Sequence, residues 1–210
     1  IHAVQDKPMT QAHLTKAQFA HRQTQTLPTV DQGAAEKMEQ AIAAAKGNGD
    51  SVGGIVECAA IGLPAGVGDP FFDSVESVLS HLFFSVPAVK GVEFGLGFAM
   101  AALTGSVCND PYTFEQGKVK TTSNHNGGIL GGITNGMPVV CRVAIKPTAS
   151  IAKEQKTISL VNQTDTTLVI KGRHDPCIVQ RAVPVIEAAM AIGLTDLLLA
   201  YAGRTGWKTI

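Results

Sequence analysis

Three ionisable side chains follow one another in the sequence Arg173-His174-Asp175, between a predicted strand and a predicted helix. An arginine is suited to bidentate recognition of a phosphate or a carboxylate. An aspartate beside an arginine favours its ionised form and can act as a base. Asp175 and Pro176 also fit a structural role, as the cap and the first residue of the helix, and a capping aspartate can also be catalytic.

A second candidate site is the turn formed by residues 146–150, Lys-Pro-Thr-Ala-Ser, directly after a predicted strand. One cation, two hydroxyl groups and a proline-stiffened backbone could bind a phosphate or a flavin carbonyl. A surface lysine followed by an ordinary turn fits the same residues equally well. From the residues alone, both interpretations stay open.

Two glycine-rich segments invite a ligand-binding interpretation. Residues 124–132 contain four glycines whose backbone could cradle an anion, with His125 among them, but their composition favours a tightly packed turn. Gly95-Leu96-Gly97 follows a predicted strand, as in dinucleotide-binding proteins. Met100 stands where such a motif needs a third glycine, so a tight turn is the better interpretation.

The composition excludes several classes of protein. The chain has 210 residues, 45% hydrophobic and 16% charged, which is typical of a folded globular protein. Its 17 basic residues balance 17 acidic ones, which argues against a nucleic-acid-binding protein with a broad basic surface. The cysteine spacings match no zinc or redox motif, so we expect reduced thiols, a cytoplasmic location and no metal site. The sequence shows neither a signal peptide nor an apolar run of the ~20 residues that span a bilayer, so no membrane partner is expected.

The elements that must position these residues are both helices and strands, which predicts an α+β fold. Periodicity predicts helices over residues 32–46, 69–86, 97–103 and 177–201, and strands over residues 51–61, 88–94, 139–145 and 167–170. Asp31 and Asp69 fit the N-caps of the first two helices, and Pro184 is expected to bend the last. Residues 1–30 are predicted to be a connecting arm and residues 104–123 a polar loop.

Four segments together resemble the chorismate synthase family, in the family's order and at similar separations. They are Ala88-Val89-Lys90-Gly91-Val92-Glu93-Phe94-Gly95, the glycine-rich residues 123–132, Lys146-Pro147-Thr148 and Gly172-Arg173-His174-Asp175-Pro176-Cys177. The resemblance extends over about residues 31–199.

The resemblance implies a lyase that converts 5-enolpyruvylshikimate 3-phosphate to chorismate and phosphate. This step of aromatic amino acid biosynthesis, in the shikimate pathway, is an anti elimination that requires reduced FMN. The resemblance also implies a β-α-β sandwich, here incomplete, in which residues 31–210 form the C-terminal part of a single domain. The family's enzymes are usually homotetramers. The sequence leaves open whether the full enzyme reduces its own flavin with NADPH.

The resemblance also implies roles for particular residues. The FMN pocket would use Ala88, Gly131, Lys146, Pro147, Thr148, Ala149, Ser150 and Arg173. Arg173 would also face the substrate, and Asp175 would be the acid/base group that works with flavin N5 in removing the ring proton.

The sequence departs from the family pattern in two ways. Pro87 stands where many members carry an amide residue, so one side-chain contact to flavin is expected to be missing. The family's N-terminal motifs, with two histidines that act as general acids, do not occur here, and neither His125 nor His174 replaces them. We therefore expect no turnover from this chain alone. The alternatives are a catalytically silent structural or oligomerising fragment of the enzyme, and an unrelated anion-binding module.

Overall fold

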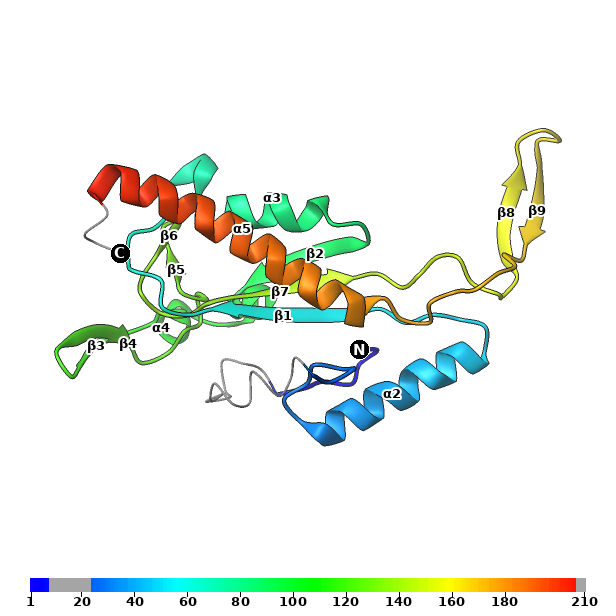
Figure 1. Ribbon diagram of the computed structural model, residues 1–210, viewed down its shortest axis with the longest axis horizontal. Helices are drawn as coiled ribbons and strands as arrows, with labels where there is room; N and C mark the ends of the chain where they lie inside the picture. The colour runs from blue at the N-terminus through cyan, green and yellow to red at the C-terminus, as the bar shows by residue number, and fades with distance from the viewer. Residues whose placement is uncertain (8–23, 207–210) are drawn as a thin grey trace. The chain divides into compact units, whose positions relative to one another are not determined.

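The computed structural model describes residues 1–7 and 24–206 (Figure 1). These residues group into two compact units. Unit 1 contains Ile1–Ile55 and Ile145–Ala182, and unit 2 contains Val56–Ala144 and Val183–Ile210. Helices and strands both occur, which confirms the α+β class. Most of the predicted N-terminal arm lies outside the described residues, so the division into an arm and one domain stays a prediction.

Helix α2, Gln32–Gly47, is the main helix of unit 1. As predicted, Asp31 caps it, because the carboxylate accepts a hydrogen bond from the backbone N–H of Gly33 at 2.9 Å. The helix packs Ala34 and Met38 against Leu27 in a small apolar core. The chain before the helix is fixed by Asp6, whose carboxylate accepts hydrogen bonds from the backbone of residues 30 and 31 at 2.6 and 2.8 Å.

Unit 1 also contains an antiparallel hairpin of strands β8, Gln155–Ser159, and β9, Thr164–Leu168, drawn in yellow in Figure 1. The predicted strand at residues 167–170 overlaps only the end of β9, and β8 was not predicted. Every β9 residue is exposed, so neither strand carries the buried alternation by which strands are recognised in a sequence.

The sheet of unit 2 has the strand order β1-β7-β2. Strands β1, Gly54–Ala60, β2, Val89–Phe94, and β7, Val139–Ile145, confirm three predicted strands, with the start of β1 three residues later than expected. β7 is the most deeply buried of the three. Its Val139, Cys141 and Val143 have no exposed surface, which makes this strand the centre of the core.

Helix α3, Val75–Ser85, covers this core with Leu79 and Phe83, which are fully buried. The predicted cap at Asp69 is wrong, because Ser74 caps the helix by accepting a hydrogen bond from the backbone N–H of Ser77. A short 3-10 helix, η1, Phe71–Asp73, precedes it. Asp69 instead forms an ion pair with Arg204, which lies 135 residues further along the chain.

Helix α5, Val179–Thr205, contains Pro184 and lies beside α3 in Figure 1. Gly193 allows this approach, because a Cβ there would lie 2.7 Å from Leu82 and 2.9 Å from Leu79.

The most apolar window of α5 has a mean hydropathy of 1.8, so by length and composition the helix could cross a membrane. The core helix of a soluble protein passes the same test, although only 28% of this window is buried, and the buried Ile186, Met190 and Leu194 recur every four residues along one face. One such helix is weak evidence for a membrane span, and the absence of a membrane partner stays a prediction.

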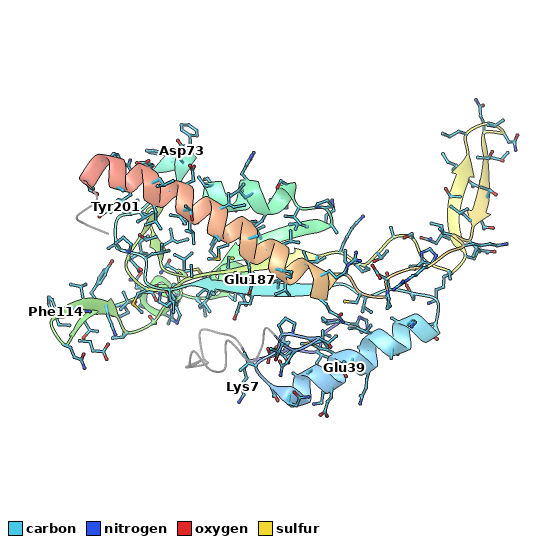
Figure 2. The ribbon with its side chains drawn as sticks, viewed as in Figure 1. Lys7, Glu39, Asp73, Phe114, Glu187 and Tyr201 are labelled. Atoms are coloured by element: carbon cyan, nitrogen blue, oxygen red, sulfur yellow. The ribbon has the colours of Figure 1, made fainter. Side chains whose placement is uncertain are left out.

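Residues 104–123 are not the polar loop that was predicted. They form helix α4, Gly105–Cys108, and an antiparallel hairpin of β3, Tyr112–Glu115, and β4, Lys118–Thr121. Phe114 of β3 is 79% exposed and labelled in Figure 2. The 3-10 helix η2, Gly97–Ala102, and the two-residue strands β5, Ile129–Leu130, and β6, Ile133–Thr134, complete the unit. The predicted short helix is therefore present but of the tighter type.

Candidate functional site

Residues 146–150, here called the lysine turn, leave the end of β7 in unit 1. Residues 51–53, here called the linking segment, run beside this turn. The hydroxyl of Ser51 donates a hydrogen bond of 2.6 Å to the backbone carbonyl of Thr148. A Cβ on Gly53 would overlap the carbonyl of Ile145 and lie 2.9 Å from Cδ of Pro147. The two stretches of backbone therefore pack with no room for a side chain at residue 53.

Thr148 provides the test of whether this turn fits a bound ligand. Its hydroxyl oxygen Oγ1 is buried and has no hydrogen-bond partner among the described residues. A buried hydroxyl without a partner is costly, so such an atom in a native protein calls for an explanation. A ligand oxygen or nitrogen would satisfy it, and the exposed Lys146 stands two residues away in the same turn. The turn thus fits an anionic, hydrogen-bonding cofactor such as FMN.

Residues 172–176, here called the aspartate turn, also lie in unit 1. The backbone N–H of Val52 donates a hydrogen bond of 2.8 Å to the carbonyl of Pro176. Asp175 forms an ion pair of 3.1 Å with Arg181. The capping role considered for Asp175 is wrong, because α5 begins only at Val179. The ion-pair partner of Asp175, Arg181, lies in the first turn of that helix, whereas the sequence suggested Arg173 as the neighbouring charge.

The linking segment therefore touches both turns. Its Ser51 binds the lysine turn and its Val52 binds the aspartate turn. Within unit 1, the structure thus brings the candidate cation of Lys146 and the candidate base Asp175 onto two turns that share one support. Neither contact was foreseen from the sequence, because Ser51 and Thr148 lie 97 residues apart.

Gly131 and Ala88, the other residues expected at the flavin, belong to unit 2. Gly131 lies in the turn between β5 and β6 with φ of 62°, and a Cβ there would meet no atom within 4 Å. Gly127 is packed instead, because a Cβ would lie 2.8 Å from the carbonyl of Val140. The packed-turn interpretation of this segment therefore holds at Gly127, while Gly131 leaves room for a ligand. Ala88 has φ of 74°, a strained conformation for a residue other than glycine.

A buried carboxylate, Asp110, anchors the glycine-rich segment, although no pattern in the sequence indicated this role. Its side chain has no exposed surface. It accepts hydrogen bonds from the hydroxyl of Ser123 at 2.7 Å, from the backbone N–H of His125 at 2.7 Å, and from the backbone and side chain of Asn126 at 2.9 and 2.8 Å. Ser123, His125 and Asn126, at the start of the segment, thus donate hydrogen bonds to a single carboxylate.

The hydrogen bonds of Asp110 also set its pKa. Burial acts to raise the pKa, but the donors from Ser123, Asn126 and His125 together outweigh burial, and the pKa of Asp110 is lowered. A lowered pKa in the folded state stabilises the protein above the pKa of the unfolded chain, about 4. That stability is lost as the pH falls through the lower value of the folded state.

We expect Asp110→Asn to lower the free energy of unfolding at pH 7 by about 2 to 4 kcal/mol. Asp110 accepts hydrogen bonds from Ser123, His125 and Asn126. In the variant, the asparagine NH2 group, which is itself a donor, would face one of these donors and leave it without an acceptor. The difference between variant and parent is expected to shrink as the pH falls below about 4, because the carboxylate of the unfolded parent becomes protonated there while that of the folded parent, with its lowered pKa, is still ionised. Urea unfolding at several pH values measures this difference. Asp196→Asn, at an exposed position of α5, is the matched control. A difference that is constant between pH 7 and pH 3 would contradict the assignment.

The turn after β2 supports the same segment from the other side. Gly95 has φ of 57°, and a Cβ there would overlap the carbonyl of His125 and lie 2.5 Å from the backbone nitrogen of Gly127. The guanidinium of Arg142 donates to the carbonyl of Gly95 at 2.9 Å and pairs with Glu93 at 3.0 Å. Gly95 is therefore a packing glycine, as the sequence suggested.

Comparison with known proteins gives a single answer. A sequence model of the chorismate synthase family matches residues 4–199. A chorismate synthase of Dehalococcoides mccartyi is 52% identical over 169 residues, which are 80% of this chain and 46% of that protein. One from Thermococcus kodakarensis is 44% identical over 198 residues, which are 94% of this chain and 54% of that protein.

Comparison of the fold with solved structures also matches a chorismate synthase. The crystal structure of a chorismate synthase matches with a TM-score of 0.72 at 31% identity, and the match covers 89% of this chain and 48% of that chain. This chain spans about half the length of the relatives that it matches.

Proposed function

Because the chain belongs to the chorismate synthase family, we propose that it forms the flavin-binding part of an enzyme that converts 5-enolpyruvylshikimate 3-phosphate to chorismate and phosphate. The enzyme would be a cytoplasmic homotetramer of the shikimate pathway. The observation that carries the flavin-binding role is the buried hydroxyl of Thr148, which has no hydrogen-bond partner within residues 1–7 and 24–206 and lies in a turn that also holds Lys146. This turn has both a charge and a hydrogen-bonding group to offer a ligand.

FMN would be held by the lysine turn. Lys146 would provide the cation, the hydroxyls of Thr148 and Ser150 would provide hydrogen bonds, and Pro147 and Ala149 form the rest of the turn. The family resemblance also places Gly131 and Ala88 among the flavin-binding residues, and a Cβ on Gly131 would meet no atom within 4 Å. The chemistry that bound reduced FMN would supply is electron density for the allylic system of the substrate.

Two residues of the aspartate turn would act on the substrate. Arg173 is exposed and would bind an anionic group of the substrate or the cofactor. Asp175 is half-buried and would accept the proton removed from the ring. Its ion pair with Arg181 orients the carboxylate, because the guanidinium fixes one oxygen at 3.1 Å. NADPH enters only if the complete enzyme reduces its own flavin.

We expect the 210 residues by themselves to show no turnover, since the general acids of the family have no counterpart among them. The measurement is phosphate release from 5-enolpyruvylshikimate 3-phosphate under anaerobic conditions with reduced FMN. A complete chorismate synthase, such as that of Dehalococcoides mccartyi, is the positive control. Phosphate release by the 210-residue chain above the enzyme-free rate would overturn the expectation. FMN binding without phosphate release would support a flavin-binding part of the enzyme. If the chain neither releases phosphate nor binds FMN, a structural or oligomerising role is favoured.

A further inference from the structure

The linking segment makes two hydrogen bonds from neighbouring residues to two different turns. Ser51 donates through its side chain to the carbonyl of Thr148 at 2.6 Å, and Val52 donates through its backbone to the carbonyl of Pro176 at 2.8 Å. Because the two donors belong to consecutive residues of one backbone, the separation of the two acceptors is limited by the short distance between those residues.

The segment itself has little freedom to move. A Cβ on Gly53 would overlap the carbonyl of Ile145, and one on Gly54 would lie 3.2 Å from Val179 at the start of α5. Val52 is buried, with 6% of its surface exposed. On the other side, the carboxylate of Asp50 accepts a hydrogen bond from the backbone of Ser51 at 2.8 Å and pairs with Lys153 at 2.7 Å. The segment is thus fixed against the elements that carry both turns.

We propose that residues 51–53 act as a clamp that holds the lysine turn and the aspartate turn at one fixed spacing, and that Ser51 is a positioning residue for FMN. This inference rests on the proposed function of the lysine turn. Ser51 acts through Thr148: its hydroxyl holds the Thr148 carbonyl, and so holds the backbone that carries Oγ1 of the same residue, an atom with no hydrogen-bond partner in the described part of the chain. The clamp also relates that hydroxyl to the carboxylate of Asp175, which lies one residue before the second acceptor.

The test uses the variant Ser51→Ala, which removes the donor and leaves the backbone unchanged. Ser51→Thr retains the hydroxyl and serves as the rescue variant. The matched control is Ser159→Ala in the β8–β9 hairpin, where the Ser159 hydroxyl likewise makes one hydrogen bond, accepting from the backbone of Asn162 at 3.2 Å. All three variants are made in the 210-residue chain.

Two readouts separate the clamp from its consequence for the flavin. The first is the carbonyl 13C chemical shift of Thr148 and of Pro176 in the labelled chain without ligand. We expect Ser51→Ala to move both signals, and Ser51→Thr to restore them. The second is the Kd for FMN, which is expected to rise about fivefold to tenfold in Ser51→Ala and to return toward the parent value in Ser51→Thr. Ser159→Ala is expected to change neither readout.

The outcomes distinguish failure of this inference from failure of the proposed function. A Pro176 signal that stays fixed in Ser51→Ala would show that the two turns are not coupled. An unchanged Kd, with FMN bound normally by the parent, would show that Ser51 does not position the flavin. If the parent chain binds no FMN, the flavin site itself is wrong and Ser51 loses that role. The carbonyl signals then still decide whether the clamp exists.

Discussion

Replacing Gly95 with alanine is expected to lower the free energy of unfolding by about 3 to 5 kcal/mol, the largest effect of any single substitution considered. Two costs add. Alanine is strained at φ of 57°, and its Cβ would overlap the carbonyl of His125 and press against the backbone of Gly127. Both obstacles are backbone atoms, which cannot rotate away as a flexible side chain can. Urea unfolding followed by far-UV circular dichroism measures the loss.

Gly105→Ala in α4 is the matched control for this substitution. It lies in the same unit, its φ is not positive, and a Cβ there would meet no atom within 4 Å. Because alanine favours a helix more than glycine does, the control is expected to be neutral or stabilising by up to about 1 kcal/mol. A Gly95→Ala chain as stable as the control would show that the turn after β2 is not packed as described.

The second large effect is expected for Lys146→Ala, which should raise the Kd for FMN about 10-fold to 100-fold. A hydrogen bond to a charged group contributes roughly 1.5 to 3 kcal/mol, and each 1.4 kcal/mol corresponds to about a factor of 10. The loss is expected whether the ammonium group binds the phosphate or a carbonyl of the flavin. Flavin fluorescence during titration measures the Kd, and raising the salt concentration should weaken the parent more than the variant.

Lys156→Ala in β8 is the control for the lost charge. Lys156 is exposed in the same unit, so its removal changes the net charge equally. We expect its Kd to stay within about twofold of the parent value, since a single exposed charge away from the ligand is largely screened. Equal losses in both variants would mean that Lys146 acts only through the general charge of the protein.

Where a signal is local, the sequence predicted the structure well. The cap of α2 depends on Asp31 and the backbone of Gly33, two residues away, and it was found. Strand β7 was predicted with the same ends, because its residues are apolar apart from Arg142, five of the seven are buried, and prolines lie close to both ends, at residues 138 and 147. The α+β class and the family both followed from such local patterns.

The errors arose where distant residues decide the local structure. Asp69 looked like the cap of α3, yet its carboxylate pairs with Arg204 on the far end of the chain. Phe71 adopts φ of 69° after Pro70, which prevents the helix from starting there, and Ser74 becomes the cap. The β3–β4 hairpin was missed since both strands are exposed apart from Thr121, although Gln116 and Gly117, with positive φ, form the kind of turn that joins such strands.

In the candidate site, too, local motifs were found from the sequence and contacts between distant residues were not. Lys146, Thr148, Arg173 and Asp175 were identified from motifs, and their roles stay predictions. The residues that support them were not identified. Asp110 collects donors 13 to 16 residues ahead of it, and Ser51 reaches a carbonyl 97 residues away. An aspartate or a serine in a loop carries no sign of such a partner, because the partner is set by tertiary packing alone.

Whether these residues form a flavin site is decided by titrating the unaltered 210-residue chain with FMN under anaerobic conditions, in both redox states. We predict saturable binding of one FMN per chain, weakened by Lys146→Ala and by Arg173→Ala and left intact by Lys156→Ala. A folded chain that shows no saturable binding at millimolar FMN would contradict the claim. So would binding that neither Lys146→Ala nor Arg173→Ala weakens.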